Sequence, residues 1–228
     1  MTTLILAAGI HGEMEYLQKF QFAIGDSELI QLADRTYGSK NAIIVLPKSI
    51  DWNVLGKIES RICNVGKTQG ALATALIALQ DCDLSQPLFI CPGDAIVRVE
   101  VYETFRIWCD ESDYDACVMV LDSENPEYSY VRVLSDKPIE FSEKKVISSR
   151  ALTGIYYFRS AELFLQSAEW ALINQVRTLG QFFIAPSLNY LIMKECDLGL
   201  FTIDVNNFYR FGTLPEATES RKRFLHDH

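Results

Sequence analysis

The sequence predicts an α/β fold in which a mainly parallel sheet carries helices on both faces. Short apolar runs of the kind that form buried strands alternate along the chain with helix-like stretches, a pattern typical of βαβ units. The composition, 49% hydrophobic and 22% charged, supplies the apolar side chains for a core and excludes wholesale disorder. The 228 residues fit a single domain, 1–228, and contain no internal repeat or linker-like tract.

The first half of the chain carries this alternation most clearly. Its predicted buried strands are residues 3–8, 41–46, 61–65 and 87–91. One helix is predicted to start after Ser27 as its N-cap and to close near Gly38, and a second, rich in alanine and leucine, covers residues 70–80. Strands and helices therefore follow one another in the order that builds a parallel sheet.

In the second half, short strands separated by turns predict a small antiparallel insertion in the sheet. The predicted strands are residues 116–121, 128–134, 139–141, 151–158 and 198–203. The predicted helices are residues 160–173, 182–194 and 215–225. This change of pattern divides the domain into two halves, 1–110 and 111–228.

Charge and cysteine content exclude several classes of protein. The chain has 21 basic and 30 acidic residues, a formal net charge of −9, whereas proteins that bind nucleic acid or anionic membranes need a basic face. No secretory signal is visible, and the longest charge-free stretch, residues 178–193, is too short and too polar for a membrane span. The six cysteines lack the spacing of a metal site, so we expect reduced thiols in a cytoplasmic protein.

Two predicted strand ends carry residues suited to phosphate chemistry, because ligands of open α/β sheets bind at the carboxyl ends of strands. The first runs from Leu6 to Gly12 and contains small residues and two glycines, which let backbone N–H groups approach a phosphate. The second ends at Asp94, a carboxylate suited to Mg²⁺. Each has a plain alternative, an ordinary tight turn for the loop and a helix N-cap for Asp94.

Six segments in a fixed order resemble the nucleotidyltransferases that activate sugar 1-phosphates. They are LAAG at 6–9, Lys19, ICPGD at 90–94, SEKK at 142–145, ALTGIYYF at 151–158 and FGTLPEA at 211–217. Residues 25–30 occupy the place of the family segment G-x-K-P-L-I, and residues 180–186 are similar to the GEFY-x-AP segment of capsule-associated members. The resemblance covers essentially the whole chain and implies a Rossmann-like three-layer α/β/α sandwich.

The resemblance implies that residues 1–110 bind a nucleoside triphosphate. Backbone amides of the glycine-rich loop would wrap the nucleotide, and Lys19 would contact the reacting phosphates. Asp94 would hold the cofactor, Mg²⁺. The implied nucleotide-binding residues are Leu6, Ala7, Ala8, Gly9, His11 and Gly12 in the loop, with Gln69, Gly70 and Ala71 at the nucleobase.

The resemblance implies that residues 111–228 bind the acceptor, a sugar 1-phosphate or a related small phosphomonoester. Glu143 would hold a substrate hydroxyl, Lys144 would hold its phosphate, and Gly154 would let the substrate ring lie against the backbone. The implied catalytic residues are Lys19, Asp94 and Lys144. An acceptor phosphate oxygen would attack the α-phosphorus and release pyrophosphate. A phosphate monoester is already nucleophilic, so the rate would come from in-line positioning and from cations.

The sequence departs from the family pattern where the triphosphate is held. Glu13 replaces the loop arginine of the family, and Arg210 replaces the aspartate of its second metal motif. Asp204, after the preceding predicted strand, is the alternative second metal ligand. His11 is either a triphosphate donor that replaces the lost arginine or an exposed loop histidine.

Two functions from different classes remain. The first is an active nucleotidyltransferase of surface-polysaccharide biosynthesis, which the retained lysines and carboxylates favour. The second is a catalytically impaired homologue that binds nucleotide or nucleotide sugar and regulates or pairs with another subunit. The sequence favours the first, because the Glu143-Lys144 pair and Asp94 are kept. Homo-oligomerisation, common among the proteins of this family, is left open.

Overall fold

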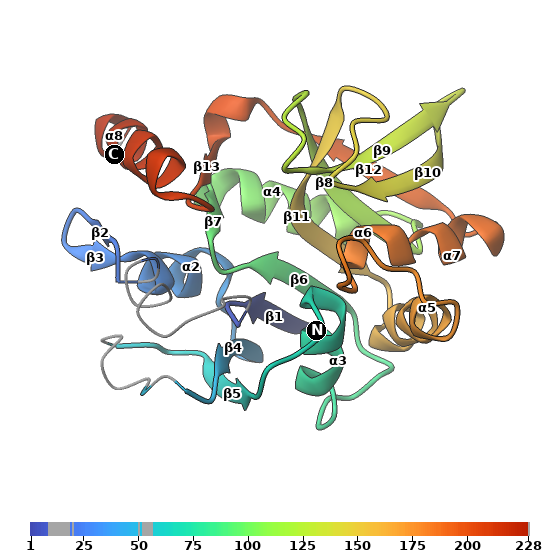
Figure 1. Cartoon of the computed structure of the whole chain (residues 1–228), viewed down its shortest axis with the longest axis horizontal. Coiled ribbons are helices and arrows are strands. Elements are labelled where there is room, and N and C mark those ends of the chain that lie inside the picture. Colours follow the sequence, from blue (N-terminus) through green and yellow to red (C-terminus); the bar gives the residue numbers. More distant parts are fainter. Residues whose placement is uncertain (9–18, 20, 50, 52–56, 228) are drawn as a thin grey trace.

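The chain is described by a computed structural model that covers residues 1–8, 19, 21–49, 51 and 57–227, and it is built around one nine-stranded sheet (Figure 1). The strands of this sheet are β1 (Thr2–Leu6), β4 (Ala42–Pro47), β5 (Arg61–Val65), β6 (Leu88–Pro92), β8 (Ala116–Asp122), β9 (Ser129–Leu134), β10 (Lys137–Glu143), β11 (Arg150–Phe158) and β12 (Leu198–Thr202). The helices are α2 (Leu29–Tyr37), α3 (Ala71–Ala78), α4 (Val99–Glu111), α5 (Ala161–Ile173), α6 (Ile184–Ser187), α7 (Asn189–Met193) and α8 (Leu214–Asp227). Helices lie on both faces of the sheet (Figure 1), so the predicted α/β sandwich is confirmed.

The sheet is mixed because β11 runs against its neighbours. β6, β1, β4 and β5 lie side by side and parallel, as the alternating first half predicted. β11 is antiparallel to β6 on one edge and to β8 on the other, and β12 continues the sheet parallel to β8. β9 and β10 form an antiparallel hairpin that joins the same sheet through β11. The predicted antiparallel insertion is this part of the sheet.

The edge of β11 that contacts β6 changes partner along its length. Residues 156–158 pair with β6, whereas residues 151 and 152 pair with β9. The register against β8 shifts over the same stretch, between Leu152 and Tyr156. The carboxyl end of β6 and the start of β9 therefore separate around Gly154, whose φ of 86° lies in the left-handed region that favours glycine.

Side chains alternate along the strands and fill one core on each face of the sheet. Along β6, Phe89 and Cys91 belong to the core that includes α2 and α4, while Leu88 and Ile90 belong to the core that includes α3 and α5. All four side chains are at most 1% exposed. A sheet covered on both faces explains why its strands read as continuous apolar runs rather than alternating ones.

The start of α2 differs from the prediction by one residue. Ser27 is not the N-cap but lies in the two-residue strand β3 (Ser27–Glu28), which pairs with β2 (Ala23–Ile24), and its hydroxyl accepts a hydrogen bond from Arg35. Glu28 is the N-cap and exchanges reciprocal hydrogen bonds with Gln31 in a capping box. The register of this small hairpin, which local sequence does not specify, sets the first residue of the helix.

The predicted helix 182–194 is divided into α6 and α7. Pro186 lacks a backbone N–H and is tolerated in the first turn of a helix, so helical structure begins at Ile184. The Asn189 side chain then exchanges hydrogen bonds with the backbone N–H and carbonyl of Phe141 in β10, each 2.8 Å long. A contact with the sheet, invisible in the local sequence, accompanies the break.

Helix α4 was missed, although Tyr102, Phe105 and Cys109 recur at helical spacing and are buried. Strands β7 (Ala95–Val97) and β13 (Phe208–Arg210) were also missed, because each is only three residues long; they pair with each other outside the main sheet. In the part of the chain that the structure describes, no helix has the length and apolarity needed to cross a membrane.

Candidate functional site

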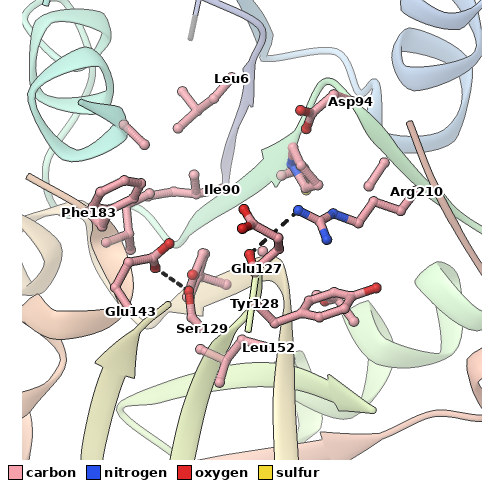
Figure 2. Close-up of a pocket in the computed structure, with 18 of the residues that line it drawn as sticks. Leu6, Ile90, Asp94, Glu127, Tyr128, Ser129, Glu143, Leu152, Phe183 and Arg210 are labelled. Carbon is pink, nitrogen blue, oxygen red and sulfur yellow. Dashed lines mark hydrogen bonds between the residues drawn. The ribbon is translucent and has the colours of Figure 1, made fainter. Parts of the chain in front are cut away.

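A cavity of about 310 Å³ opens where β6 and β9 separate along β11 (Figure 2). Its walls come from the carboxyl ends of β1 and β6, the first turn of α3, the β9–β10 hairpin and β13. The predicted site residues that line it are Leu6, Ala7, Ala8, Lys19, Ala71, Asp94, Glu143, Lys144 and Gly154. The predicted loop residues Gly9, His11 and Gly12 lie outside the described residues, as does Glu13.

The carboxyl ends of β1 and β6 are held closely together at Gly93. The Gly93 N–H donates a hydrogen bond of 2.9 Å to the Leu6 carbonyl oxygen. A Cβ added to Gly93 would lie 2.7 Å from the Ala7 Cβ and 3.0 Å from that carbonyl oxygen. Because Cβ atoms do not approach other atoms so closely, glycine is required here, and the close approach delivers Asp94 to the cavity.

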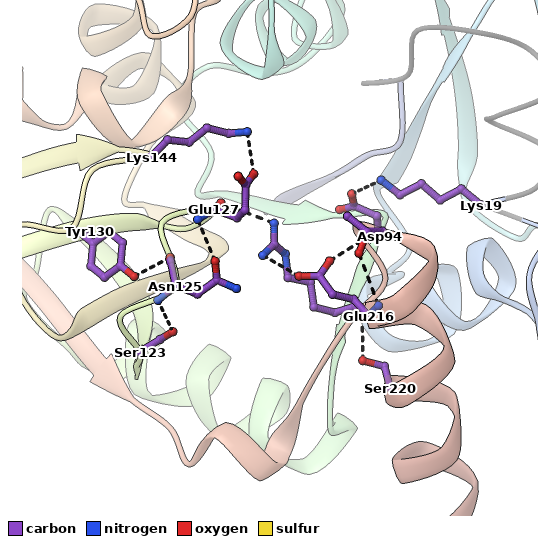
Figure 3. Close-up of polar contacts among 11 residues, drawn as sticks. Lys19, Asp94, Ser123, Asn125, Glu127, Tyr130, Lys144, Glu216 and Ser220 are labelled. Atoms are coloured by element: carbon purple, nitrogen blue, oxygen red, sulfur yellow. Dashed lines mark hydrogen bonds and ion pairs between the residues drawn. The ribbon is translucent and has the colours of Figure 1, made fainter.

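Asp94 faces the cavity as one half of an ion pair. Its carboxylate oxygen lies 2.5 Å from Nζ of Lys19 (Figure 3), and its carbonyl oxygen accepts a hydrogen bond from the Phe211 N–H at 2.9 Å. The alternative role of helix cap is wrong, because Asp94 precedes strand β7 and Arg98 is the N-cap of α4. The two residues expected to act on the nucleotide phosphates are therefore in direct contact.

Glu143 ends β10 on the opposite side of the cavity from Asp94 (Figure 2). It is the register partner of Ser129 at the start of β9, and the Ser129 hydroxyl donates a hydrogen bond to its carboxylate. Burial raises the pKa of Glu143, and this effect exceeds the opposing effects of the Ser129 hydrogen bond and of the nearby Lys144 charge. Burial therefore disfavours the charged form of Glu143 relative to that of an exposed glutamate.

Lys144 follows Glu143 with a φ of 53° and also lines the cavity. Its N–H donates a 3.0 Å hydrogen bond to the Tyr128 carbonyl oxygen, and its Nζ lies 3.0 Å from a carboxylate oxygen of Glu127 (Figure 3). The hydrogen bond that Nζ of Lys144 donates to the Glu127 carboxylate, together with the positive charge of Lys144, lowers the pKa of Glu127. The loop between β8 and β9 is therefore fastened to Lys144 through both backbone and side chain.

Arg210 enters the cavity from β13, which pairs with β7 immediately after Asp94. Its Nη1 lies 3.1 Å from a carboxylate oxygen of Glu216, and its guanidinium carbon lies 4.7 Å from the centre of the Tyr128 ring. Its Nη2 lies 3.5 Å from the Glu127 carbonyl oxygen, toward which the side chain points in Figure 2. A cation therefore lines the cavity at the position where the family that the sequence resembles has an aspartate.

Two residues expected at the nucleobase lie just outside the cavity lining. The Gln69 side chain accepts a hydrogen bond of 2.8 Å from Arg177. Gly70 is the N-cap of α3, and a Cβ there would lie 2.3 Å from the Phe182 carbonyl oxygen. The segment before α6 thus packs against the start of α3 and fixes this wall.

The structure does not bring Asp204, the alternative second metal ligand, to the cavity. Asp204 is exposed and does not line the cavity. Its carboxylate accepts a 2.8 Å hydrogen bond from the Asn206 N–H and caps the short 3₁₀ helix η2 (Val205–Asn207). Capping an adjacent turn is a common use of an aspartate after a strand, and it leaves Asp94 without this partner.

Several lining residues were not anticipated from the sequence, among them Glu127, Tyr128, Ser129 and Phe183. Pro126 marks a turn before three of them, but a turn signal does not reveal which way its neighbours point. Their roles depend on the hairpin register and on the loop contacts described above. The local sequence carries no signal for either.

Comparison with solved structures identifies proteins of similar architecture. A nucleoside-diphosphate-sugar pyrophosphorylase from Vibrio cholerae matches with a TM-score of 0.80 at 19% sequence identity, over 97% of this chain and 100% of that one. A UDP-glucose pyrophosphorylase complexed with UDP-glucose matches with a TM-score of 0.75 at 14% identity, over 100% of this chain and 99% of that one. No protein-family model and no curated protein sequence matches the chain.

The chain has the nucleotide-sugar pyrophosphorylase fold. The fold implied by the sequence resemblance is therefore confirmed. A candidate glucose-1-phosphate thymidylyltransferase from Bacillus anthracis, in complex with sucrose, shares this pyrophosphorylase fold with a TM-score of 0.72 at 17% identity, over 97% of this chain and 94% of that one. At such low identity the similarity concerns the fold, and the chemistry of this chain has to be argued from its own cavity.

Proposed function

We propose that this protein transfers a nucleoside monophosphate from a nucleoside triphosphate to a sugar 1-phosphate or a related small phosphomonoester, with release of pyrophosphate. One observation carries the proposal: two lysine side chains line the same cavity. Lys19 is paired with Asp94 on one wall, and Lys144 is paired with Glu127 on the other. Each lysine would contact one phosphate, so the geometry suits a reaction between two phosphate groups. Residues 1–110 would then bind the nucleotide and residues 111–228 the acceptor.

The reaction would form a bond between an acceptor phosphate oxygen and the α-phosphorus. The bond from the α-phosphorus to the oxygen that bridges it to the β-phosphate would break, and pyrophosphate would leave with that electron pair. Lys19 would contact the donor phosphates and Lys144 the acceptor phosphate, which holds the two groups in line. Because the acceptor phosphate supplies its own electron pair, no side chain has to remove a proton.

The remaining walls would supply recognition. The backbone of residues 6–8 and the first turn of α3 would hold the nucleotide. Glu143 would accept a hydrogen bond from a hydroxyl of the acceptor, and Gly154 would leave room for its ring. The similarity of residues 180–186 to capsule-associated proteins points to precursors of surface polysaccharides as acceptors for a cytoplasmic enzyme.

The fit of the cavity to Mg²⁺ depends on Asp94. Among the residues that the structure describes, no group of three His, Cys, Asp or Glu side chains is arranged as a metal cage. Asp94 nevertheless suits Mg²⁺ as a single ligand, because this ion commonly takes one or two carboxylates and completes its shell with phosphate oxygens and water. When bound there, Mg²⁺ would neutralise charge on the phosphates. Lys19 would then share the Asp94 carboxylate or release it.

The test is release of pyrophosphate in the presence of Mg²⁺, measured across the common nucleoside triphosphates and a panel of sugar 1-phosphates and related phosphomonoesters. Turnover with one pair that depends on both substrates supports the proposal. Nucleotide binding without turnover in any pair contradicts it. Asp136→Asn, at an exposed turn outside the cavity, is the control for substitutions at Asp94.

A second candidate function, binding of nucleotide or nucleotide sugar without turnover, is favoured by one observation. The residue of β13 that enters the cavity is the cation Arg210, opposite Ala95, and the alternative carboxylate, Asp204, lies outside the cavity. A protein that keeps the phosphate contacts but binds a metal ion weakly would bind its ligand without turnover. Such a protein would regulate or pair with another subunit. The turnover experiment separates the two functions.

A further inference from the structure

We propose that Arg210 is a phosphate-contacting residue of the cavity, which binds the nucleotide phosphates where they meet the acceptor phosphate and does so without a divalent cation. The inference rests on the proposed function and identifies the part of the ligand that this side of the cavity recognises. It follows from the placement, the fixation and the charge surroundings of this guanidinium.

The placement of Arg210 is set by the small β7–β13 sheet. Arg210 is the register partner of Ala95, and the next residue, Phe211, donates its N–H to the Asp94 carbonyl oxygen at 2.9 Å. The side chain runs from there into the cavity toward Glu127 (Figure 2). Glu127 is also the partner of Lys144, and Figure 2 shows the guanidinium between Glu127 and Asp94.

Four neighbours fix the orientation of Arg210. Glu216 pairs with Nη1 at 3.1 Å, and the Tyr128 ring lies under the guanidinium at 4.7 Å. The Glu127 carbonyl oxygen accepts from Nη2 at 3.5 Å, and the Ser220 hydroxyl donates to the Arg210 carbonyl oxygen at 2.7 Å. A guanidinium carries five N–H donors, whereas the contacts with Glu216, the Glu127 carbonyl oxygen and the Tyr128 hydroxyl involve fewer. A fixed guanidinium with further donors suits bidentate binding of a phosphate.

The charge surroundings distinguish Arg210 from the two lysines. Lys19 and Lys144 are each paired with a carboxylate that itself lines the cavity, so a phosphate that binds either lysine must compete with that carboxylate. Glu216, the partner of Arg210, lies outside the cavity lining, in the first turn of α8. A phosphate can therefore approach Arg210 from the cavity while Glu216 keeps its place.

The experiment is calorimetric titration with a panel of nucleoside diphosphate glucoses and with inorganic pyrophosphate, in EDTA and again in Mg²⁺. We expect the wild-type protein to bind one nucleotide sugar in EDTA, and Arg210→Met to weaken that binding about ten-fold or more, the effect of losing a hydrogen-bonded charge. Arg210→Lys should recover only part of the affinity, because an ammonium group lacks the fork of donors.

Matched variants separate this role from a general loss of charge or of folding. Arg132→Met removes an arginine that is paired with Glu140 at 2.8 Å outside the cavity, and it should bind like the wild type. Glu216→Gln keeps the Arg210 charge but loosens its orientation, so it should weaken binding less than Arg210→Met does. If Arg210→Met does not fold, the affinities of Glu216→Gln and Arg210→Lys relative to the wild type test the proposal instead.

The outcomes for Arg210 and for the proposed reaction are distinguishable. Equal affinity of wild type and Arg210→Met in EDTA overturns the inference, and so does binding that requires Mg²⁺ in the wild type. If the wild type releases pyrophosphate but Arg210→Met binds normally, the inference fails and the proposed function stands. If Arg210-dependent binding occurs without turnover, the inference stands and nucleotidyl transfer fails.

Discussion

Asp94 and Glu143 face one cavity from its two sides, yet the described structure gives them different partners. Asp94 is paired with Lys19 at 2.5 Å, and its side chain is 38% exposed. Glu143 accepts a hydrogen bond from the neutral hydroxyl of Ser129, and burial raises its pKa. The lysine that follows Glu143 in sequence reaches instead to Glu127 in the β8–β9 loop.

This difference separates two uses of a carboxyl group. On the β6 side, an ion pair already stands where a cation and phosphates would bind, so binding there requires an exchange of charged partners. On the β10 side, a poorly hydrated carboxyl group is suited to a neutral partner such as a sugar hydroxyl, and the phosphate contact is left to a separate lysine. Substitutions on the two sides should therefore affect different measured quantities.

The largest expected effect is that of Asp94→Asn. We expect kcat to fall by roughly 10²–10³, the usual consequence of removing a group that stabilises charge at the reacting centre. Affinity for nucleotide in EDTA should not fall, because asparagine removes a negative charge and releases Lys19 for the phosphates. Steady-state pyrophosphate release and Mg²⁺-free titration measure the two quantities. Unchanged turnover would show that Asp94 has no role at the reacting centre.

Lys144→Met tests the other side. It should raise KM for the acceptor about ten-fold or more, because a charge-assisted hydrogen bond to phosphate is lost, and it should leave KM for the nucleoside triphosphate unchanged. Initial rates with each substrate varied in turn give both constants. A rise in nucleotide KM alone would assign Lys144 to the donor side and reverse the comparison of the two walls.

Glu127→Gln is expected to act in the opposite direction from Lys144→Met. The Glu127 carboxylate is paired with the Lys144 ammonium group at 3.0 Å, and an acceptor phosphate must displace this carboxylate to bind Lys144. Partly exposed ion pairs contribute about 0–1 kcal/mol, so the acceptor KM should fall by a factor of up to about five. In the Lys144→Met background the same substitution should have no effect, which a double-mutant cycle measures. An equal change in both backgrounds would show that Glu127 does not compete for Lys144.

The position of the cavity could be predicted from the sequence because it follows from strand order. β1 and β6 read as buried strands, and parallel neighbours bring their carboxyl ends to one edge, where residues 6–8 and Asp94 lie. Glu143 and Lys144 were expected from the resemblance, and the β9–β10 hairpin brings them to the same cavity. Strongly apolar, continuous strand segments dictate the β1–β6 part of this arrangement.

The partners of these residues could not be predicted in the same way. Whether Lys144 contacts Glu127 or Glu143 depends on how the β8–β9 loop closes over the hairpin. Asp204 illustrates the same limit, because a 3₁₀ turn of three residues binds its carboxylate. Contacts between loops distant in sequence leave no periodic pattern, so only the folded chain reveals them.

Glu143→Gln is the smallest expected effect and tests the state of the buried carboxyl group. A carboxyl group whose pKa is raised by folding binds its proton more tightly in the folded state, so folding stability is lost as pH rises from the ordinary value of 4.5 through the raised pKa. Glutamine carries no charge and keeps an oxygen that can accept the Ser129 hydroxyl hydrogen bond. Glu143→Gln should therefore be more stable than the wild type at pH 8 and equal to it well below pH 4.5. Urea denaturation across this pH range measures the difference.

Asp94→Asn should show no such gain in stability, because it removes an ion pair rather than a poorly hydrated charge. Equal pH profiles of stability for the two variants would contradict the distinction between the two sides of the cavity.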